Sequence, residues 1–468
     1  MAAPNKAVAP NAARSATSRS LLEPPSLNRD RTPGLGTSPA RDSPSFPLRA
    51  ALLRTIVVGS TMSLTEAELV QIGTTYLYPN YRQPPLVMSH GRGVELWDKS
   101  GRRYLDFIAG IAVNSTGHAH PSVVSAIAEQ AARLMQISNY FFNEPNILLA
   151  RRLCQQSGMA RALFCNSGTE AIEAGLKLAR RYFYNQQQPD RHRIIAFERS
   201  FHGRTMGSLA ATGQAAYRDG FGPLSSVTHV PYGDAAAVRA AMGPDVAAIL
   251  VEPVQGEGGV TLPPHGFLAE LRAIADAHGC LLMADEIQTG IGRTGTFLAF
   301  EHWGVQADIV ALAKGLGGGF PIGAMLCRAH LQDTLPPGSH GSTFGGNPLA
   351  SATALAVLDV LESEQLMEAA QTQGDYLGVR LSAIAEKYPR LAREARGIGL
   401  LRALELAEGV DARSLLTTLR ERGLLVSIAG GCALRFSPAL VVKPTQIDEA
   451  LAVLDEVLNE LGNTTPKR

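Results

Sequence analysis

The stretch LLMADEIQTGIGRTGTFLAFEHWGVQADIVALAKGLGGGF, residues Leu281–Phe320, decides the fold. It holds two apolar runs of strand length, Leu281–Ala284 and Ile309–Ala313. Asp285 follows the first run and Lys314 follows the second. In an open α/β sheet, functional groups gather just beyond the carboxyl ends of the strands. The stretch therefore predicts two strand ends that bring an acid and an amine to a common crevice.

Such a pair suits one cofactor, pyridoxal 5′-phosphate (PLP). A lysine holds its aldehyde as a Schiff base, and its pyridinium nitrogen needs an acidic partner. Each residue also has an ordinary explanation. A lysine after a strand is usually a solvated loop charge, and an aspartate there often caps a helix or forms a turn. The rest of the chain decides between these interpretations.

The composition describes a globular protein with a sizeable core. The 468 residues include 43 basic and 42 acidic side chains and are 45% hydrophobic, which argues against a nucleic-acid partner. At about 150 residues per domain, this length predicts two or three domains. The sequence has no uninterrupted apolar run of the roughly 18 residues that a membrane-spanning helix needs, so we expect no membrane partner.

Residues 1–61 differ from everything that follows. This segment is rich in alanine, serine, proline and arginine, and its prolines prevent any long helix. We expect it to be disordered, because it cannot bury enough apolar surface. An arginine- and serine-rich, acid-poor start also fits a transit peptide for an organelle matrix. The simpler interpretation is an extension upstream of a true start at Met62, which predicts a cytoplasmic protein.

Other strands also end at polar residues. The run Leu163–Cys165 leads into Asn166–Glu170, which opens a helix. Backbone N–H groups at a helix start bind anions, although an ordinary capped helix would look the same. Arg193–Phe197 and Ala247–Val251 read as further strands. Strands that alternate with helices predict a mostly parallel sheet flanked by helices.

Two patterns are weaker than they look. Gly290–Gly295, GIGRTG, matches the GxGxxG pattern of dinucleotide-binding proteins. That site needs its glycines immediately between a strand and a helix, and residues 296–300 do not clearly open a helix. His118 and His120 have no cysteine or carboxylate partner at ligand spacing, so we expect no metal site.

The C-terminal part is predicted as a smaller α+β unit. Strands Leu400–Leu406 and Leu424–Ser427 flank the helix Ala412–Arg422, and a closing helix spans Thr445–Leu461. Arg435 lies in an apolar strand, so its charge needs an internal ion pair or an anionic ligand.

Six motifs together carry a resemblance to a known family: CNSGTEAIEAGLKLAR (165–180), SFHGRT (200–205), VEPVQGEGGV (251–260), LLMADEIQTGIGRTG (281–295), ALAKGLGGGFPIGAM (311–325) and HGSTFGGNPLA (340–350). Through them the chain from about residue 62 to residue 462 resembles the class III, PLP-dependent aminotransferases of fold type I. The resemblance implies a homodimer with shared active sites. It also implies a large PLP-binding domain at 119–345 and a small domain built from 62–118 and 346–468.

The resemblance implies a role for each cofactor-binding residue. Lys314 would form the Schiff base and move a proton between substrate and cofactor. Asp285 would pair with the pyridinium nitrogen, Gln288 would bind the phenolate oxygen, and Phe201 would stack on the ring. A further set would hold the phosphate, its last member reaching over from the partner subunit: Ser167, Gly168, Thr169 and Thr343.

The same resemblance implies a substrate site. Arg204 would bind a substrate carboxylate, for which its planar fork is suited, and Ser342 would also contact the substrate. Glu257 would pair with Arg435 while the amino donor is bound. It would release that arginine when 2-oxoglutarate or glutamate arrives.

Within the family the chain is most similar to acetylornithine aminotransferases, on residues 110–120, GIAVNSTGHAH, and 313–323, AKGLGGGFPIG. The implied ping-pong reaction converts N-acetyl-L-ornithine and 2-oxoglutarate into N-acetyl-L-glutamate 5-semialdehyde and L-glutamate, in arginine biosynthesis. Aminotransferases for ornithine, succinylornithine, N-succinyldiaminopimelate and 4-aminobutyrate share much of this scaffold and remain alternatives.

Overall fold

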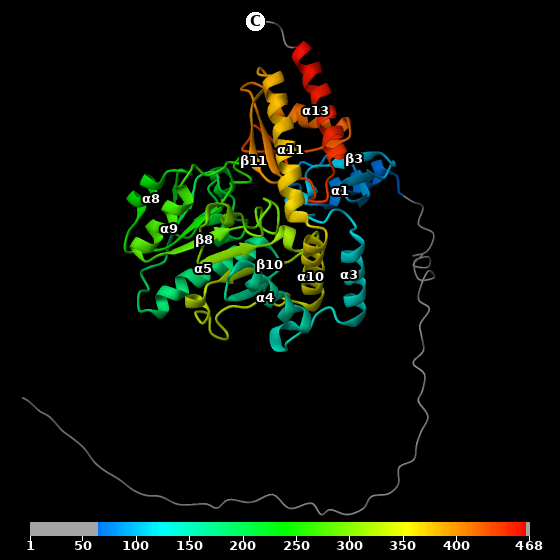
Figure 1. Ribbon diagram of the computed structural model, residues 1–468. Coiled ribbons are helices and arrows are strands. Elements are labelled where there is room, and N and C mark those ends of the chain that lie inside the picture. The colour runs from blue at the N-terminus through cyan, green and yellow to red at the C-terminus, as the bar shows by residue number, and fades with distance from the viewer. Residues whose placement is uncertain (1–63, 465–468) are drawn as a thin grey trace, which may run out of the picture. The chain divides into compact units, whose positions relative to one another are not determined.

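The computed structural model describes residues 64–464 (Figure 1). The disorder expected for residues 1–61 falls outside this range. Between residues 64 and 464, none of the helices is both long and apolar enough to cross a membrane.

A seven-stranded sheet forms the larger part of the described chain, in the order β4-β10-β9-β8-β7-β5-β6. Its strands from β9 to β6 run parallel, whereas β10 is antiparallel to both of its neighbours. The predicted α/β class and the mostly parallel sheet are therefore confirmed. The bounds are β4 (Arg161–Cys165), β5 (Arg193–Phe197), β6 (Val227–Val230), β7 (Val246–Val251), β8 (Leu281–Asp285), β9 (Ile309–Leu312) and β10 (Gly323–Cys327).

Helices cover both faces of this sheet, which explains why its central strands are continuously apolar. Every residue of β7, β8 and β9 is buried. Successive side chains of a strand point to opposite faces. Ile249 of β7 packs in the same core cluster as α9 (Phe267–His278), and Leu250 packs with α5 (Gly168–Asn185). Smaller helices on the large sheet are α6 (Met206–Ala211), α7 (Ala215–Arg218) and α8 (Ala235–Ala241).

The strand register aligns the polar ends of the central strands. Val251 pairs with Ala284, and Asp285 pairs with Ala311. The chain therefore leaves β7, β8 and β9 at the same edge of the sheet. This alignment places the residues after the three strands side by side.

Two smaller sheets lie outside the large one (Figure 1). The first contains β1 (Met88–Arg92), β2 (Glu95–Asp98), β3 (Arg103–Asp106) and β13 (Leu424–Leu425). The second contains β11 (Ala392–Ile398), β12 (Leu401–Leu406), β15 (Ala433–Phe436) and β14 (Ser427–Ala429). Strand β13 thus joins the N-terminal hairpins to the C-terminal part of the chain. The predicted single strand 424–427 is instead split between the two sheets.

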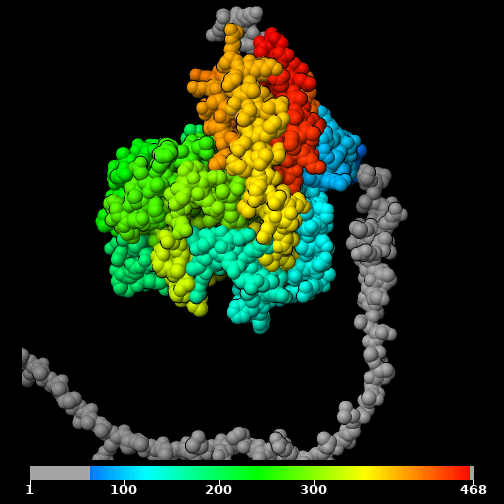
Figure 2. Space-filling model, in the orientation of Figure 1, coloured from blue at the N-terminus to red at the C-terminus, as the bar shows by residue number. Residues whose placement is uncertain are grey.

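Several of the remaining helices pack against one another in pairs. In Figure 1, α10 lies beside α3 and α11 beside α13. The space-filling view shows the orange and red C-terminal elements as a separate lobe next to the green lobe of the large sheet (Figure 2). The domain boundaries at residues 118 and 345 stay a prediction. The bounds are α1 (Glu66–Tyr76), α2 (Ala109–Ala112), α3 (Pro121–Arg133), α4 (Glu144–Ser157), α10 (Pro348–Ser363), α11 (Leu366–Lys387), α12 (Ala412–Glu421) and α13 (Pro444–Thr464).

The GIGRTG stretch does not start a nucleotide-binding helix. After Gly295 the chain continues in turns to a short 3₁₀ segment, Ala299–Trp303. A dinucleotide site would need an α-helix at this point. The structure therefore agrees with the expectation that this match is incidental.

Candidate active site

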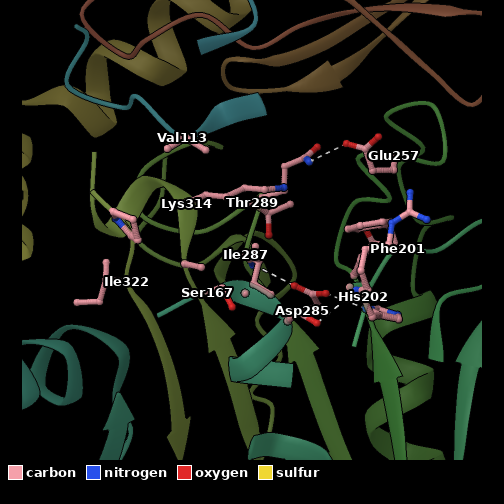
Figure 3. Close-up of a pocket in the computed structure, with 18 of the residues that line it drawn as sticks. Val113, Ser167, Phe201, His202, Glu257, Asp285, Ile287, Thr289, Lys314 and Ile322 are labelled. Carbon is pink, nitrogen blue, oxygen red and sulfur yellow. Dashed lines mark hydrogen bonds and ion pairs between the residues drawn. The ribbon is translucent and has the colours of Figure 1, made fainter. Parts of the chain in front are cut away.

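A cavity of about 410 Å³ lies at the edge where β7, β8 and β9 end (Figure 3). Its volume falls within the usual range for small-molecule sites. The structure brings nine of the residues singled out from the sequence to its wall: Ser167, Gly168, Thr169, Phe201, Arg204, Glu257, Asp285, Gln288 and Lys314.

Asp285 enters the cavity in a fixed orientation. Its Oδ2 lies 2.7 Å from Nδ1 of His202, and its Oδ1 accepts a hydrogen bond from the N–H of Ile287 at 3.1 Å. Both Asp285 and His202 are buried. Figure 3 shows the two side chains pointing toward each other. The carboxylate can therefore present a lone pair to a cationic nitrogen without reorienting.

His202 was not predicted as a site residue. It stands in the SFHGRT motif, directly after the side chain that was expected to stack on the cofactor ring. Its Nε2 is buried and has no hydrogen-bond partner among the described residues. A polar residue after a strand was the available signal, but the sequence does not show that it contacts Asp285.

Lys314 follows β9 in a strained conformation. Its φ of +41° lies in the left-handed region, which costs a non-glycine residue roughly 1–2 kcal/mol. Burial lowers the pKa of the Lys314 amine; Glu257 opposes that shift, and Arg435 adds to it. A lowered pKa increases the fraction of neutral amine, which is the form that acts as nucleophile and base. Strain of this kind is typical of functional positions.

The start of α5 forms one wall of the cavity. The Ser167 hydroxyl caps the helix by accepting from the N–H of Glu170 at 3.4 Å, and other first-turn N–H groups have no partner within the helix. A Cβ on Gly168 would lie 2.9 Å from the Ile287 side chain, so any larger residue here would have to displace Ile287. The Thr169 hydroxyl lies 2.6 Å from the Ser208 hydroxyl. This wall suits a phosphate.

Arg435 and Glu257 form the internal ion pair that the sequence left as one alternative. Arg435 Nη1 lies 2.5 Å from Glu257 Oε1, and the arginine side chain is only 3% exposed. Gln288 joins the pair, since its oxygen accepts from Arg435 at 3.2 Å and its nitrogen donates to Glu257 at 3.3 Å. Burial by itself would raise the pKa of Glu257, but Arg435 and Lys314 bring that pKa below its usual value.

Glu252 is a further cavity residue that the sequence analysis did not single out. It follows β7, is buried, and accepts a hydrogen bond from the N–H of Phe201 at 3.2 Å. Burial and the charge of Asp285 raise the pKa of Glu252 well above its ordinary value. This shift favours the neutral form of Glu252.

Ser342 and Thr343 do not line this cavity. The Ser342 hydroxyl accepts hydrogen bonds from Asn166 at 3.2 Å and from the N–H of Gly345 at 3.0 Å. The carbonyl of Thr343 accepts from Gln136 at 2.5 Å. The predicted contacts of these two residues with substrate and phosphate stay predictions.

The cavity offers one group for each polar end of PLP. It has an amine of lowered pKa for the aldehyde, an oriented carboxylate for the ring nitrogen, and a helix start for the phosphate. The glycine at position 168 allows the backbone to approach. The residues present therefore fit this cofactor.

The raised pKa of Glu252 predicts a pH-dependent stability. Above pH 4.5 the folded chain keeps a proton on Glu252 that the unfolded chain has released, so this residue lowers the free energy of unfolding as pH rises toward its folded pKa. Glutamine resembles the neutral acid but cannot ionise. We expect Glu252→Gln to gain stability relative to the wild type as the pH rises above 4.5, measured by urea denaturation of the cofactor-free protein.

The surface variant Glu270→Gln is the control, because Glu270 is an exposed residue on α9. Its stability difference from the wild type should change little over the same range. A pH-independent difference for Glu252→Gln would contradict a neutral Glu252.

Comparisons with known proteins agree with this site. The acetylornithine aminotransferase of Myxococcus xanthus is 48% identical over 391 residues, covering 83% of this chain and 97% of that protein. The protein of that name from Pseudomonas putida is 44% identical and covers 80% and 93%. The crystal structure of an ornithine aminotransferase from Toxoplasma gondii superposes with a TM-score of 0.82 at 36% identity, covering 86% and 96%.

A further solved structure, the acetylornithine aminotransferase of Elizabethkingia anophelis, gives a TM-score of 0.76 at 34% identity and covers 85% of this chain and 100% of that one. Residues 76–458 match the family described as aminotransferase class-III. This range holds the whole cavity, including Lys314 and Asp285. The chain belongs to the class III aminotransferases, which use PLP.

Proposed function

We propose that this chain is an acetylornithine aminotransferase of arginine biosynthesis, acting in the cytoplasm. It would move the δ-amino group of N-acetyl-L-ornithine to 2-oxoglutarate, giving N-acetyl-L-glutamate 5-semialdehyde and L-glutamate. The observation that carries the proposal is the Glu257–Arg435 pair beside Lys314. Relatives with this activity in their names, 42–48% identical, support it.

When bound, PLP supplies an aldehyde for the substrate amine and an electron-poor ring that accepts the electrons of the broken C–H bond. Asp285 would hold the ring nitrogen, Phe201 the ring face and Gln288 the phenolate oxygen. Ser167, Gly168 and Thr169 would hold the phosphate. Each of these residues lines the cavity.

Lys314 would carry the proton in both directions. Its Nζ is close enough to Glu257 and Arg435 to respond to both charges, and burial favours its neutral form. A neutral amine can accept the proton from the substrate carbon and then donate it to the cofactor. Positioned proton transfer of this kind contributes about 10²–10⁴-fold to rate.

The two substrates place their carboxylates differently. N-acetylornithine presents its δ-amine with its carboxylate far away, whereas glutamate carries a carboxylate next to the reacting amine. Arg204 would bind the remote carboxylate in both cases. Glu257 would cover Arg435 for the first substrate and uncover it for the second.

We include a homodimer in the proposal. A second cavity is lined by three consecutive aromatic residues that are largely exposed in the single chain: Tyr140 at 88%, Phe141 at 72% and Phe142 at 92%. Soluble monomers rarely leave such a cluster in water. The same cavity includes Ser342, so a second copy seated there would bring Thr343 close to an active site. Equilibrium sedimentation should give twice the chain mass; a monomer at micromolar concentration would contradict this part.

The substrate assignment is tested by specificity constants. We expect kcat/KM for N-acetylornithine to exceed the values for ornithine, succinylornithine and 4-aminobutyrate, measured with 2-oxoglutarate as acceptor. A larger value for ornithine would instead favour an ornithine δ-aminotransferase; the Toxoplasma gondii structure bears the name ornithine aminotransferase. Lys314→Ala should lower kcat at least about 10²-fold, because it removes the proton carrier.

The ion pair predicts opposite effects on the two half-reactions. Arg435→Leu should raise KM for 2-oxoglutarate roughly 10- to 100-fold, the usual loss for a charged hydrogen bond, and should affect N-acetylornithine less. Glu257→Gln should mainly weaken the N-acetylornithine half-reaction, because Arg435 is then never covered. Single-turnover absorbance changes with each substrate separate the two effects. Equal losses in both half-reactions would argue against a switch.

A further inference from the structure

The guanidinium group of Arg204 is held by aromatic rings. Its Cζ lies 3.8 Å from the ring centroid of Tyr217 and 5.4 Å from that of Phe201. The two rings meet edge to face, with centroids 6.1 Å apart and planes at 89°. In the described part of the chain, these rings are the recorded partners of the guanidinium and no carboxylate pairs with it.

The short helix α7, which carries Tyr217, is attached to the large sheet through Arg218. Arg218 Nη1 donates to Nδ1 of His229 on β6 at 3.1 Å, and Nε2 of His229 donates to the carbonyl of Ala211 at 3.2 Å. Burial and the charge of Arg218 lower the pKa of His229 to about 4, so the imidazole is neutral and can accept from the arginine. Arg218 therefore ties α7, the helix that carries Tyr217, to β6.

A ring that covers the face of a guanidinium leaves the hydrogen-bond donors at its edge free. Arg204 is exposed at the cavity wall, so these donors can reach a ligand. The ring holds the cation without competing for those donors, whereas a carboxylate partner would occupy them. Because an arginine side chain has many rotamers, a fixed guanidinium also loses less entropy on binding.

We infer that Tyr217 is a positioning residue that sets the preference of this enzyme for amino donors with a carboxylate remote from the reacting amine. It acts by holding Arg204 as a permanent clamp at the wall of the cavity. The inference rests on the carboxylate role of Arg204 in the proposed function. It adds the residue that keeps the clamp in place.

The test compares two substrates that differ only in the carboxylate. N-acetyl-1,4-diaminobutane is N-acetylornithine without that group. We expect Tyr217→Leu to lower the ratio of kcat/KM for N-acetylornithine to kcat/KM for N-acetyl-1,4-diaminobutane about 2- to 30-fold, the range of a cation–π contact. Tyr217→Phe keeps a ring and should restore the wild-type ratio. Tyr184→Leu is the matched control, because it removes a similar ring from Arg181 at the other end of α5.

A second measurement does not depend on the reaction. Calorimetry of glutarate binding to the cofactor-free protein should show a Kd that is larger by a similar factor for Tyr217→Leu. Tyr217→Phe should keep the wild-type Kd. Far-ultraviolet circular dichroism checks that each variant is folded. An unchanged ratio and an unchanged Kd in Tyr217→Leu would overturn the inference if Arg204→Leu lowers the ratio and raises the Kd.

Two of these measurements also distinguish a failure of this inference from a failure of the proposed function. If Arg204→Leu changes neither the kcat/KM ratio nor the glutarate Kd, then Arg204 does not bind a carboxylate. The inference about Tyr217 then fails as well. If the wild type prefers ornithine to N-acetylornithine, the substrate assignment fails. The glutarate measurement still decides the role of Tyr217 in that case.

Discussion

The active site depends on burying several ionisable side chains together at one edge of the large sheet. Glu252 and Lys314 follow β7 and β9, and Asp285 is the last residue of β8 between them; neighbouring strands lie about 4.8 Å apart in any sheet. A buried charge without a partner is costly, so each needs a specific neighbour. Asp285 has His202, and Glu252 can remain neutral. The charges of Glu257 and Arg435 act in opposite directions on the pKa of Lys314, and burial shifts the amine toward its neutral form. The reactive state of the amine is thus a consequence of where the strands end.

The need to pair buried charges also explains how the smaller lobe takes part in the site. Arg435 reaches Glu257 at the cavity wall from β15, whose neighbours β12 and β14 belong to a different sheet from the catalytic strands. Its Nε donates to Ser427 on β14, and its Nη1 reaches Gly256 and Glu257. One end of the guanidinium is therefore fixed within the small sheet, and the other meets a side chain of the large lobe. Such a contact can open without breaking the core of either lobe.

The sequence predicts this architecture where its signals are local. The runs before Asp285 and Lys314 are continuous because helices cover both faces of their strands, and the structure has β8 and β9 there. Strand β10 was missed, because glycines surround it and its pairing with β4 joins positions far apart in the chain. His202 and Glu252 were missed for a related reason. A contact over 83 positions, as between His202 and Asp285, leaves no trace in spacing. Only the resemblance to a family linked Glu257 with Arg435 before their contact was seen.

Two arginines at one cavity are held in opposite ways, and this difference suits two substrates. Arg435 is buried against a carboxylate, so a ligand must displace Glu257 before it gains the arginine, and its binding is conditional. Arg204 is exposed and covered by rings, which leave its edge free at all times. A remote carboxylate, which both substrates carry, suits the permanent site. A carboxylate beside the reacting amine, which only one of them carries, suits the conditional site.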